Sequence, residues 1–540
     1  MAMQPGAGGD GTRQPEGGRK ELPERKRRDR KEEEGRMSED NRKNAAGQEI
    51  PASMIQQKEK RKKNQSASLN KMAFTSGFFF ILAQLLARGF NFIVTPIYSR
   101  LLTKAQYGIV TTYESWLLIA YTVMSLCLWR SVDVAKHDFS DDYNGYVSSV
   151  HTLSYIAIAI FFGICMLFKE QVMAFCDMDD LMFYMLFLYV FTYTSMLYVQ
   201  RRDKQVMKYK FSTAATVLTI IPGTVLSIAL LYQGRIQGLV DQLVHRRIVG
   251  YYAPQIIGGA LIAILIWWQG KKFVNLKYWK YGLAYSLPLI PEALSVQIMN
   301  QSDRIIIKKI VGDTAAGIFS LGMTVSYVIW ILEDSVWNAW IPWLYEKIAR
   351  EEANEVEKPW VIVMHMFGLL SWLLVALAPE EILILGGERY REAVWLIAPL
   401  VTGTLFRFFS YSYSAVQNYY KRTQYVAMGT IGAMILNLVI SYIGIALFGY
   451  MAAAYMMAIS YFVLLLLQGF LEHKITGMVI VPLGRTVKIS FAYLAVNLAT
   501  MGLYLLPWYA RYAAILIVLL IGLKVFYPQM RAVLKMLKKK

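Results

Sequence analysis

Residues 425–447 read YVAMGTIGAMILNLVISYIGIAL, a stretch that contains no charged side chain. A helix of this length crosses roughly 30 Å of hydrocarbon, and a lipid-exposed backbone must satisfy its own hydrogen bonds by being helical. Comparable runs lie on both sides of it and predict fourteen spans in all, at about 74–97, 108–129, 148–168, 181–200, 211–232, 250–268, 281–302, 316–341, 359–378, 392–412, 425–447, 450–470, 486–506 and 509–526. The sequence therefore predicts an all-α polytopic membrane protein.

The composition excludes several classes of protein. Of the 540 residues, 56% are hydrophobic and 18% are charged, whereas a soluble domain carries about 25% charged residues. A soluble enzyme or a DNA-binding protein is therefore excluded, and we interpret the net charge of +19 as membrane topology and not as nucleic-acid binding. Cys127, Cys165, Cys176 and five scattered histidines form neither a disulfide framework nor a zinc site, so we expect no metal or other cofactor.

The chain divides into four predicted parts. The first is a disordered basic tail, because it has too few apolar side chains to offset the entropy of ordering. Its basic runs could contact the headgroups of membrane lipids. Two lobes of six spans each follow, and then two further spans with a basic C-terminal tail. The expected boundaries are 1–72, 73–280, 281–480 and 481–540.

The charges of the short loops predict the orientation in the membrane. Basic clusters lie between spans 4 and 5, between spans 6 and 7, after span 10 and at the C-terminal end. All of them fall on the side of the N-terminal tail, which the positive-inside rule makes the cytoplasm. We therefore expect a protein of the cytoplasmic membrane with both termini inside. One loop departs from the rule, because Arg235, Arg246 and Arg247 between spans 5 and 6 are expected outside.

Two segments indicate an internal repeat. Arg100-Leu-Leu-Thr-Lys-Ala-Gln-Tyr-Gly108-Ile-Val is similar to Lys309-Ile-Val-Gly-Asp-Thr-Ala-Ala-Gly317-Ile-Phe, at an offset of 209 residues and six spans. An even number of spans preserves orientation, so the pattern predicts two six-helix lobes in a parallel pseudo-twofold repeat, unless the short match is a coincidence. Two such lobes are typical of a transporter whose site lies between them.

The sequence resembles the polysaccharide transporter (oligosaccharide flippase) family of the MOP superfamily, which also holds lipid II flippases and MATE exporters. The matching segments lie in order, at Arg88-Gly89-Phe90, Ile97–Gly108, Ser302–Ser320, Ala378–Tyr390 and Asn437–Ala454. The resemblance implies fourteen helices in two lobes and the export of a lipid-linked oligosaccharide. The long basic tail departs from the family pattern.

Charged residues inside spans are costly, so they are candidates for a substrate cavity. Arg88 lies past the midplane of span 1 and either binds diphosphate oxygens bidentately or pairs with Glu114 of span 2. Arg407 lies in the inner half of span 10. It forms either a salt bridge with the carboxylates of span 8 at Glu333 and Asp334 or a second anion contact.

Three further sets of residues have two interpretations each: the charged residues at the outer end of span 7, the amides, and the tryptophans of span 8. Asp303 and Arg304 are expected to reach the outer interface, with substrate binding by Arg304 as the alternative. Asn91 and other amides are expected either to line the cavity or to join helices. Trp337, Trp340 and Trp343 are expected in the interfacial belt, with sugar stacking as the alternative.

Glu292 is expected in the middle of span 7, between Pro288 and Pro291. Prolines inside a helix remove hydrogen bonds and kink it, which offers a hinge. A carboxylate beside such a kink either binds H+ or Na+ and couples transport to an ion gradient, or stays protonated as a structural group. We expect coupling or gating roles for Glu292, Glu333, Asp334 and the two prolines.

The sequence therefore predicts a flippase that moves a polyprenyl-(di)phosphate-linked oligosaccharide by alternating access through a cationic cavity, and not an enzyme. The alternative is a MATE-like, ion-coupled exporter of small cationic molecules. A membrane glycosyltransferase would need acidic residues in its first outer loop, and Ser99–Tyr107 has none. A phosphate-binding GxxxxGK[ST] motif is absent from the sequence, which argues against ATP hydrolysis.

Overall fold

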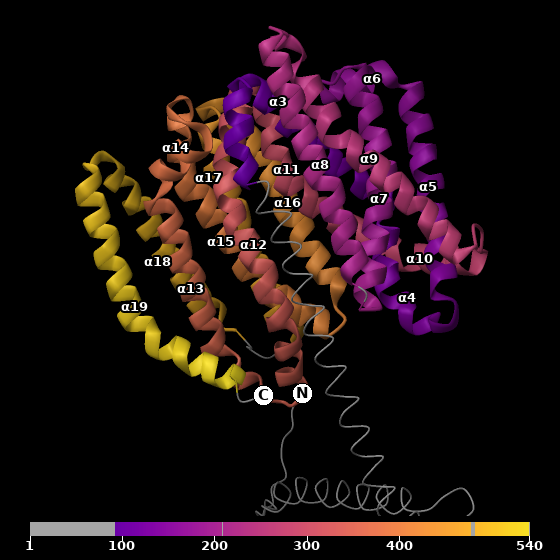
Figure 1. Cartoon of the computed structure of the whole chain (residues 1–540). Helices are drawn as coiled ribbons and strands as arrows, with labels where there is room; N and C mark the ends of the chain where they lie inside the picture. Colours follow the sequence, from indigo (N-terminus) through magenta and orange to yellow (C-terminus); the bar gives the residue numbers. More distant parts are fainter. Residues whose placement is uncertain (1–91, 208, 477–480, 539–540) are drawn as a thin grey trace, which may run out of the picture. The chain divides into compact units, whose positions relative to one another are not determined.

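The computed structural model describes residues 92–207, 209–476 and 481–538, and every regular element in these ranges is a helix (Figure 1). The expected disordered tail at 1–72 lies outside the described residues, as do Arg88 and Asn91. The long helices are α3 Lys104–Met124, α5 Tyr143–Leu167, α7 Asp180–Gln205, α8 Tyr209–Ile236, α9 Leu243–Gly270, α11 Ile290–Ile310, α12 Asp313–Ala349, α13 Glu357–Ala376, α15 Val394–Tyr419, α16 Thr423–Phe448, α17 Met451–Thr476, α18 Leu483–Thr500 and α19 Trp508–Lys538.

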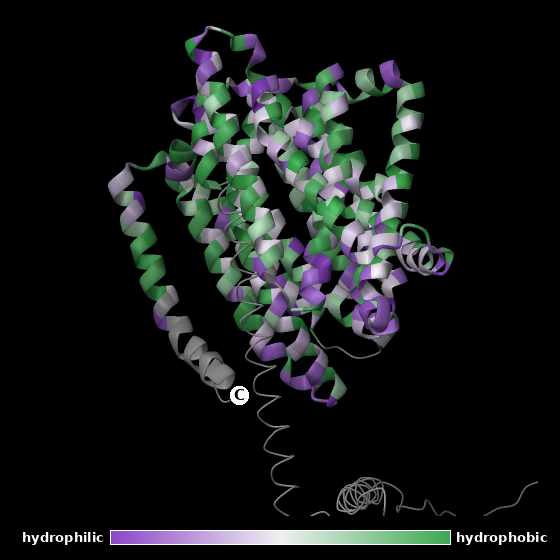
Figure 2. Cartoon of the chain, turned by 45° about the vertical axis from the view of Figure 1, so that its right-hand side comes forward, coloured by the Kyte–Doolittle hydropathy of each residue, from purple (hydrophilic) through white to green (hydrophobic). Residues whose placement is uncertain are grey.

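Most of the predicted spans have a helix at their place. Ten helices of the described residues are long and apolar enough to cross a membrane, and an eleventh is the bent pair Lys104–Met124 and Leu128–Asp138, with 60° between its parts. Figure 2 shows hydrophobic residues along the lengths of the helices and hydrophilic residues gathered near their ends. The expectation of an all-α polytopic membrane protein is confirmed.

Local sequence explains where α3 begins and where it bends. Thr103 caps its first turn, because its hydroxyl accepts from the backbone N–H of Gln106 while the Gln106 side chain accepts from the Thr103 N–H. At the other end Leu126 and Cys127 have φ near +50°, a left-handed conformation that ends the helix. The chain then continues as η1 Leu128–Ser131 and α4 Val132–Asp138.

The predicted seventh span differs from the structure. In place of one helix over 281–302, the chain forms α10 Leu276–Ser286, a short η4 Leu287–Leu289, and then α11. Pro288 and Pro291 are the second residues of η4 and α11, in the first turn where the missing N–H costs nothing, so they lie at helix starts and do not kink a helix. Glu292 consequently lies in the first turn of α11 and not in mid-span.

The helices pack in two groups that share α3. Helices α5, α7, α8 and α9 contact one another, and helices α11 to α18, which include the short α14 Ala378–Gly386, contact one another (Figure 1). Helix α3 packs against α7 and α9 of the first group and against α11 and α12 of the second. α19 lies along α13. α10 is the segment of chain that joins the two groups.

The two segments of the sequence repeat contact each other where α3 crosses α12. A Cβ atom at Gly108 would overlap the carbonyl oxygen of Asp313, and one at Gly317 would overlap that of Lys104. The Thr111 hydroxyl donates to Ser320 Oγ at 2.9 Å, and these residues are again 209 positions apart. Glycine is needed at both positions because the backbones approach too closely for a side chain. The close contact at this crossing fixes the position of α3 along its axis relative to α12.

Candidate functional site

Two adjoining cavities surround the side chain of Arg407. The larger has a volume of about 370 Å³ and lies between α12 and α15. The smaller, of about 120 Å³, extends between α11, α15, α16 and α17. Both are lined by Arg407, Tyr411, Ser414 and Asn418, and together they are called the Arg407 cavity below. It lies toward the C-terminal halves of α12 and α15.

Arg407 is held by groups from two helices. Its Nη2 lies 2.5 Å from Glu333 Oε2 of α12, and its Nη1 donates to the Tyr411 hydroxyl at 3.0 Å. Its guanidinium carbon is 4.0 Å from the centre of the Trp330 ring. The side chains of Arg407 and Glu333 are 9% and 2% exposed. The predicted salt bridge is therefore present with Glu333, and the side chain of Asp334 is outside the described set.

Aromatic rings form much of the wall of the Arg407 cavity. Trp330, Trp337, Tyr345 and Tyr411 all line its larger part. The expectation that Trp337 and Trp340 belong to an interfacial belt is wrong. Both are buried, and they pack on Trp360 of α13 with ring centres 5.6 and 5.1 Å apart. Tryptophan at a helix end usually marks the interface, but the C-terminal part of α12 is covered by α13 and α15.

Glu292 lines the smaller part of the cavity and carries a second ion pair. Arg130 Nη1 of η1 lies 2.9 Å from Glu292 Oε2, and both side chains are about a quarter exposed, at 29% and 24%. Arg130 is thus bound to α11, although an arginine at the end of a predicted span is typical of an interfacial anchor. This pair joins η1 of the first group of helices to α11 of the second.

Asp303 and Arg304 are buried inside the protein, so the expectation that they reach the interface is wrong. They lie in the middle of α11, because that helix begins nine residues later than the predicted span. Arg304 Nη2 donates to the Tyr327 hydroxyl of α12 at 2.5 Å, and its Nη1 donates to Gln301 Oε1 at 2.7 Å. Gln301 Oε1 also accepts from Ser115 of α3 at 3.0 Å.

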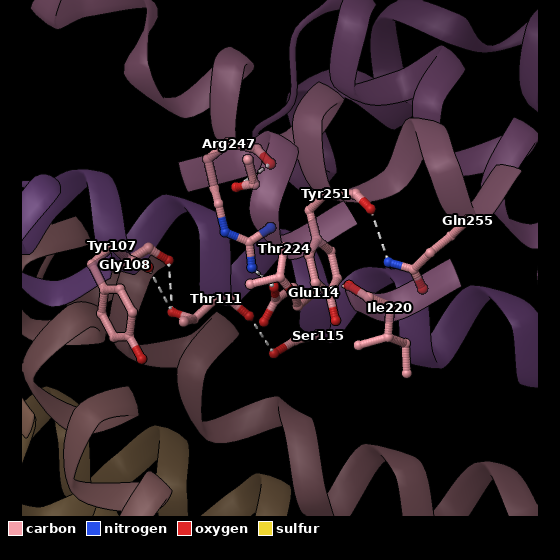
Figure 3. A network of polar contacts seen from close by, with 11 residues as sticks. Tyr107, Gly108, Thr111, Glu114, Ser115, Ile220, Thr224, Arg247, Tyr251 and Gln255 are labelled. Atoms are coloured by element: carbon pink, nitrogen blue, oxygen red, sulfur yellow. Dashed lines mark hydrogen bonds and ion pairs between the residues drawn. The ribbon is translucent and has the colours of Figure 1, made fainter. Parts of the chain in front are cut away.

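Glu114 pairs with a residue that the sequence analysis placed in an outer loop. Arg247 Nη2 of α9 lies 3.1 Å from Glu114 Oε1 of α3. The two side chains are labelled in Figure 3. The Arg247 guanidinium carbon is 4.2 Å from the ring centres of both Tyr98 and Tyr251. The Arg247 side chain is 6% exposed, and that of Glu114 is 33% exposed.

The sequence contained one signal that could have identified Arg247. The loop between spans 5 and 6 was the one that departed from the positive-inside rule. The structure removes much of this anomaly, because α9 begins at Leu243 and not near residue 250, so that Arg247 lies inside a helix. An arginine that breaks a topology rule beside an apolar run is thus a candidate for burial. The alternative pairing of Glu114 with Arg88 involves a residue outside the described ranges.

Polar contacts join the helix ends that lie away from the Arg407 cavity. Lys104 Nζ at the start of α3 lies 2.8 Å from Oε1 of Glu392, which is two residues before the start of α15. Arg389 Nη2 donates to the carbonyl oxygen of Leu102 at 2.7 Å. Lys308 Nζ, at the end of α11, lies 2.7 Å from Asp177 Oδ2 in the turn before α7. These contacts connect both groups of helices at that end.

The comparisons with known proteins agree with one another. The family model described as polysaccharide biosynthesis protein matches residues 74–347. The Lsg locus putative protein 1 of Haemophilus influenzae is 22% identical over 354 residues, which cover 62% of this chain and 81% of that protein.

Two solved structures share the arrangement of helices. The lipid II flippase MurJ in an inward closed conformation has a TM-score of 0.59 at 14% identity and covers 84% of this chain and 99% of its own. An inward-facing multidrug resistance MATE family transporter of the MOP superfamily has a TM-score of 0.56 at 13% identity, with 72% and 94% covered. The fold is that of the MOP superfamily.

Proposed function

The chain belongs to the polysaccharide biosynthesis protein family, and from that premise we propose that this multi-pass membrane transporter is a flippase for a polyprenyl-(di)phosphate-linked oligosaccharide. It moves the lipid from the inner to the outer leaflet of the cytoplasmic membrane, for the synthesis of a cell-surface polysaccharide. The charged head of such a lipid cannot cross hydrocarbon unaided, so the protein must offer it a polar cavity that contains cations.

The observation that carries the proposal is the Arg407 guanidinium in a cavity walled by aromatic rings. A guanidinium binds phosphate oxygens bidentately, which an ammonium group cannot do. Flat aromatic faces at Trp330 and Tyr411 are surfaces against which sugar rings pack. Ser414 and Asn418 add groups that can hydrogen-bond hydroxyls. Phosphate and sugar can thus be bound side by side.

We propose that both termini are cytoplasmic and that the Arg407 cavity faces the inner leaflet. The contacts of Lys104, Arg389 and Lys308 then close the outer side. Entry of a phosphate competes with Glu333 for Arg407. The two lobes expected at 73–280 and 281–480 rock about the Gly108–Gly317 crossing, which exposes the cavity to each side in turn. Arg88 and Asn91 remain candidates for the same cavity.

We further propose that an ion gradient drives the cycle through Glu292. This carboxylate lines the cavity and is bound to Arg130 across the two groups of helices. Uptake of H+ or binding of Na+ at Glu292 would weaken that pair and release η1 from α11. The break at Pro288 and Pro291 between α10 and α11 gives the chain a place to bend there.

A MATE-like exporter of cations is the second candidate, because Glu292 and Glu333 both line the Arg407 cavity. Carboxylates in a cavity are what a cationic substrate needs. Each of these two is bound to an arginine, however, so a cation would have to displace Arg130 or Arg407. An anion has to displace Glu333 from Arg407, and the guanidinium can then bind phosphate oxygens bidentately, which we regard as the better use of this geometry.

The test is mass spectrometry of the lipid extract from a deletion strain that is complemented with variants. We expect a polyprenyl-diphosphate oligosaccharide to accumulate in the deletion strain and in cells that express Arg407→Gln or Arg88→Ala. The wild type and Arg391→Gln, a matched loss of charge on an exposed arginine, should clear it. An unchanged lipid pool together with sensitivity to cationic compounds would establish the exporter instead. An accumulated lipid with an incomplete glycan would point to a glycosyltransferase.

A further inference from the structure

Arg247 and Arg407 lie at two different levels of the helix bundle. From the crossing at Gly108, Glu114 is six residues along α3, or about 9 Å at 1.5 Å per residue. From Gly317, Glu333 is sixteen residues along α12, or about 24 Å. Because both helices run in the same direction from the crossing, the Arg247–Glu114 pair is roughly 15 Å nearer that end than the Arg407–Glu333 pair.

The Arg247 side chain has more hydrogen-bonding capacity than the protein uses. A guanidinium has five N–H donors, and Nη2 donates to Glu114 at 3.1 Å. Within the part of the chain that the structure describes, the buried Nε and Nη1 of Arg247 have no hydrogen-bond partner, and neither has Nε of Arg304 on α11. Leaving such donors unsatisfied is costly, so a group that supplied oxygens to them would bind favourably.

The surroundings of Arg247 hold the guanidinium in place without using those donors. The rings of Tyr98 and Tyr251 each lie 4.2 Å from its central carbon, which is close enough for a cation–π interaction. The Glu114 carboxylate is a third exposed, so it can leave Arg247 at a lower cost than a fully buried group could. Ser115, the next residue of α3, is linked through Gln301 to Arg304. A second cation is therefore connected to the same part of α3.

We infer that Arg247 is a second binding position for the phosphate group of the substrate, reached after Arg407, and that Glu114 occupies it in this structure. This inference rests on the proposed function. Transfer from Arg407 to Arg247 carries the anion roughly 15 Å toward the outer leaflet. Glu114 then returns to Arg247 and displaces the phosphate. The carboxylate and the phosphate thus compete for the same guanidinium, and this competition releases the substrate.

The experiment measures the binding of farnesyl diphosphate to the full-length protein in lipid nanodiscs, by calorimetry and by the shift in thermal unfolding. Arg407→Gln should weaken binding at least tenfold. Adding Glu114→Gln in that background should restore affinity at least fivefold, because Arg247 loses its competitor. Adding Arg247→Gln as a third change should remove the restored binding. The control is Arg246→Gln, one residue away, at a side chain that donates to Gln233 and Gln237. As the third change it should leave the restored binding intact.

The outcomes separate this inference from the function on which it rests. If the wild type binds farnesyl diphosphate and Arg407→Gln does not, but Glu114→Gln restores nothing, then Arg247 is not a phosphate site and the Arg407 proposal survives. If the wild type does not bind the probe, both fail. Should Arg247→Gln not fold, Arg247→Lys keeps the charge but loses the bidentate geometry, and we expect it to bind at least threefold more weakly in the Glu114→Gln background.

Discussion

Arg407 and Glu333 are 74 residues apart in the sequence, and their side chains meet at 2.5 Å with both nearly removed from solvent. Breaking a buried ion pair by removing one partner leaves an uncompensated charge, which costs about 3–5 kcal/mol. Arg407→Gln should therefore lower both the stability and the transport of the protein. The thermal unfolding midpoint in detergent and lipid export in cells measure the two effects.

A double variant distinguishes structural from functional effects at this pair. Arg407→Gln with Glu333→Gln removes both charges of this pair together, so we expect part of the stability to return. Transport should stay at least tenfold below the wild type, because the phosphate ligand is still missing. Recovery of transport together with stability would mean that the pair only holds α12 to α15.

Trp330 and Trp360 allow a comparison of a cavity wall with a packed core. Trp330 lines the Arg407 cavity, whereas Trp360 is completely buried. Trp330→Ala should reduce export at least fivefold with a small change in unfolding midpoint, and Trp330→Phe should keep most of the activity. Trp360→Ala should cost about 3–5 kcal/mol of stability by creating a cavity. Equal losses of stability in the two alanine variants would contradict a sugar-binding role for Trp330.

Gly108 is expected to tolerate no side chain. A methyl group there would overlap the Asp313 carbonyl oxygen, so Gly108→Ala should separate α3 from α12 and reduce both the yield of folded protein and its export. Gly163 in α5 is the matched control, because a Cβ atom there would meet no atom of the described residues within 4 Å. Gly163→Ala should be neutral or stabilising by up to about 1 kcal/mol, through helix propensity. Size-exclusion profiles and unfolding midpoints of the two variants test this.

The stability of the folded protein should depend on pH through Glu381, which lies in α14 Ala378–Gly386. Burial and the neighbouring Glu380, which pairs with Arg511, raise the pKa of Glu381 from 4.5 to about 8. The folded protein therefore holds a proton that the unfolded chain has lost, and stability falls as the pH rises from 4.5 to 8. Glu381→Gln should remove this loss.

Unfolding midpoints at a series of pH values measure the effect. The difference between Glu381→Gln and the wild type should be small at pH 5, grow up to about pH 8 and then level off. A difference that is constant over this range would show that Glu381 has the same pKa in both states. Glu388→Gln, at an exposed carboxylate that follows α14, is the control and should show no such trend.

Much of the fold could be predicted from the sequence because long apolar runs determine helices almost by themselves. The Gly108–Gly317 match predicted two similar lobes, and the contact between its two segments became visible only in the structure. α11 was misplaced because it contains Glu292, Asp303, Arg304 and two lysines, so its polar sequence does not stand out as a span. The bounds of α11 depend on its packing against α3, α12 and α16. The hydrophobic pattern of a single segment does not contain this information.

Part of the candidate site could also be predicted, where charged residues interrupt an apolar run. Arg407 and Glu333 lie within apolar runs, so their cost in a membrane made them visible. Arg247 lies at the edge of a run, where basic residues ordinarily mark a loop, and its burial depends on Tyr98 and Glu114 from other helices. Burial of Trp337 likewise depends on α13. Such tertiary partners are what a single sequence does not contain.

The crossing of α3 and α12 has one more consequence, which concerns symmetry. Residue 104 meets 317 and residue 108 meets 313, so each partner presents the same patch to the other. This is the form of an isologous interface between two copies of one subunit. The parallel repeat predicted from the sequence requires an interface of this form, because equivalent patches of two like halves meet across a twofold axis.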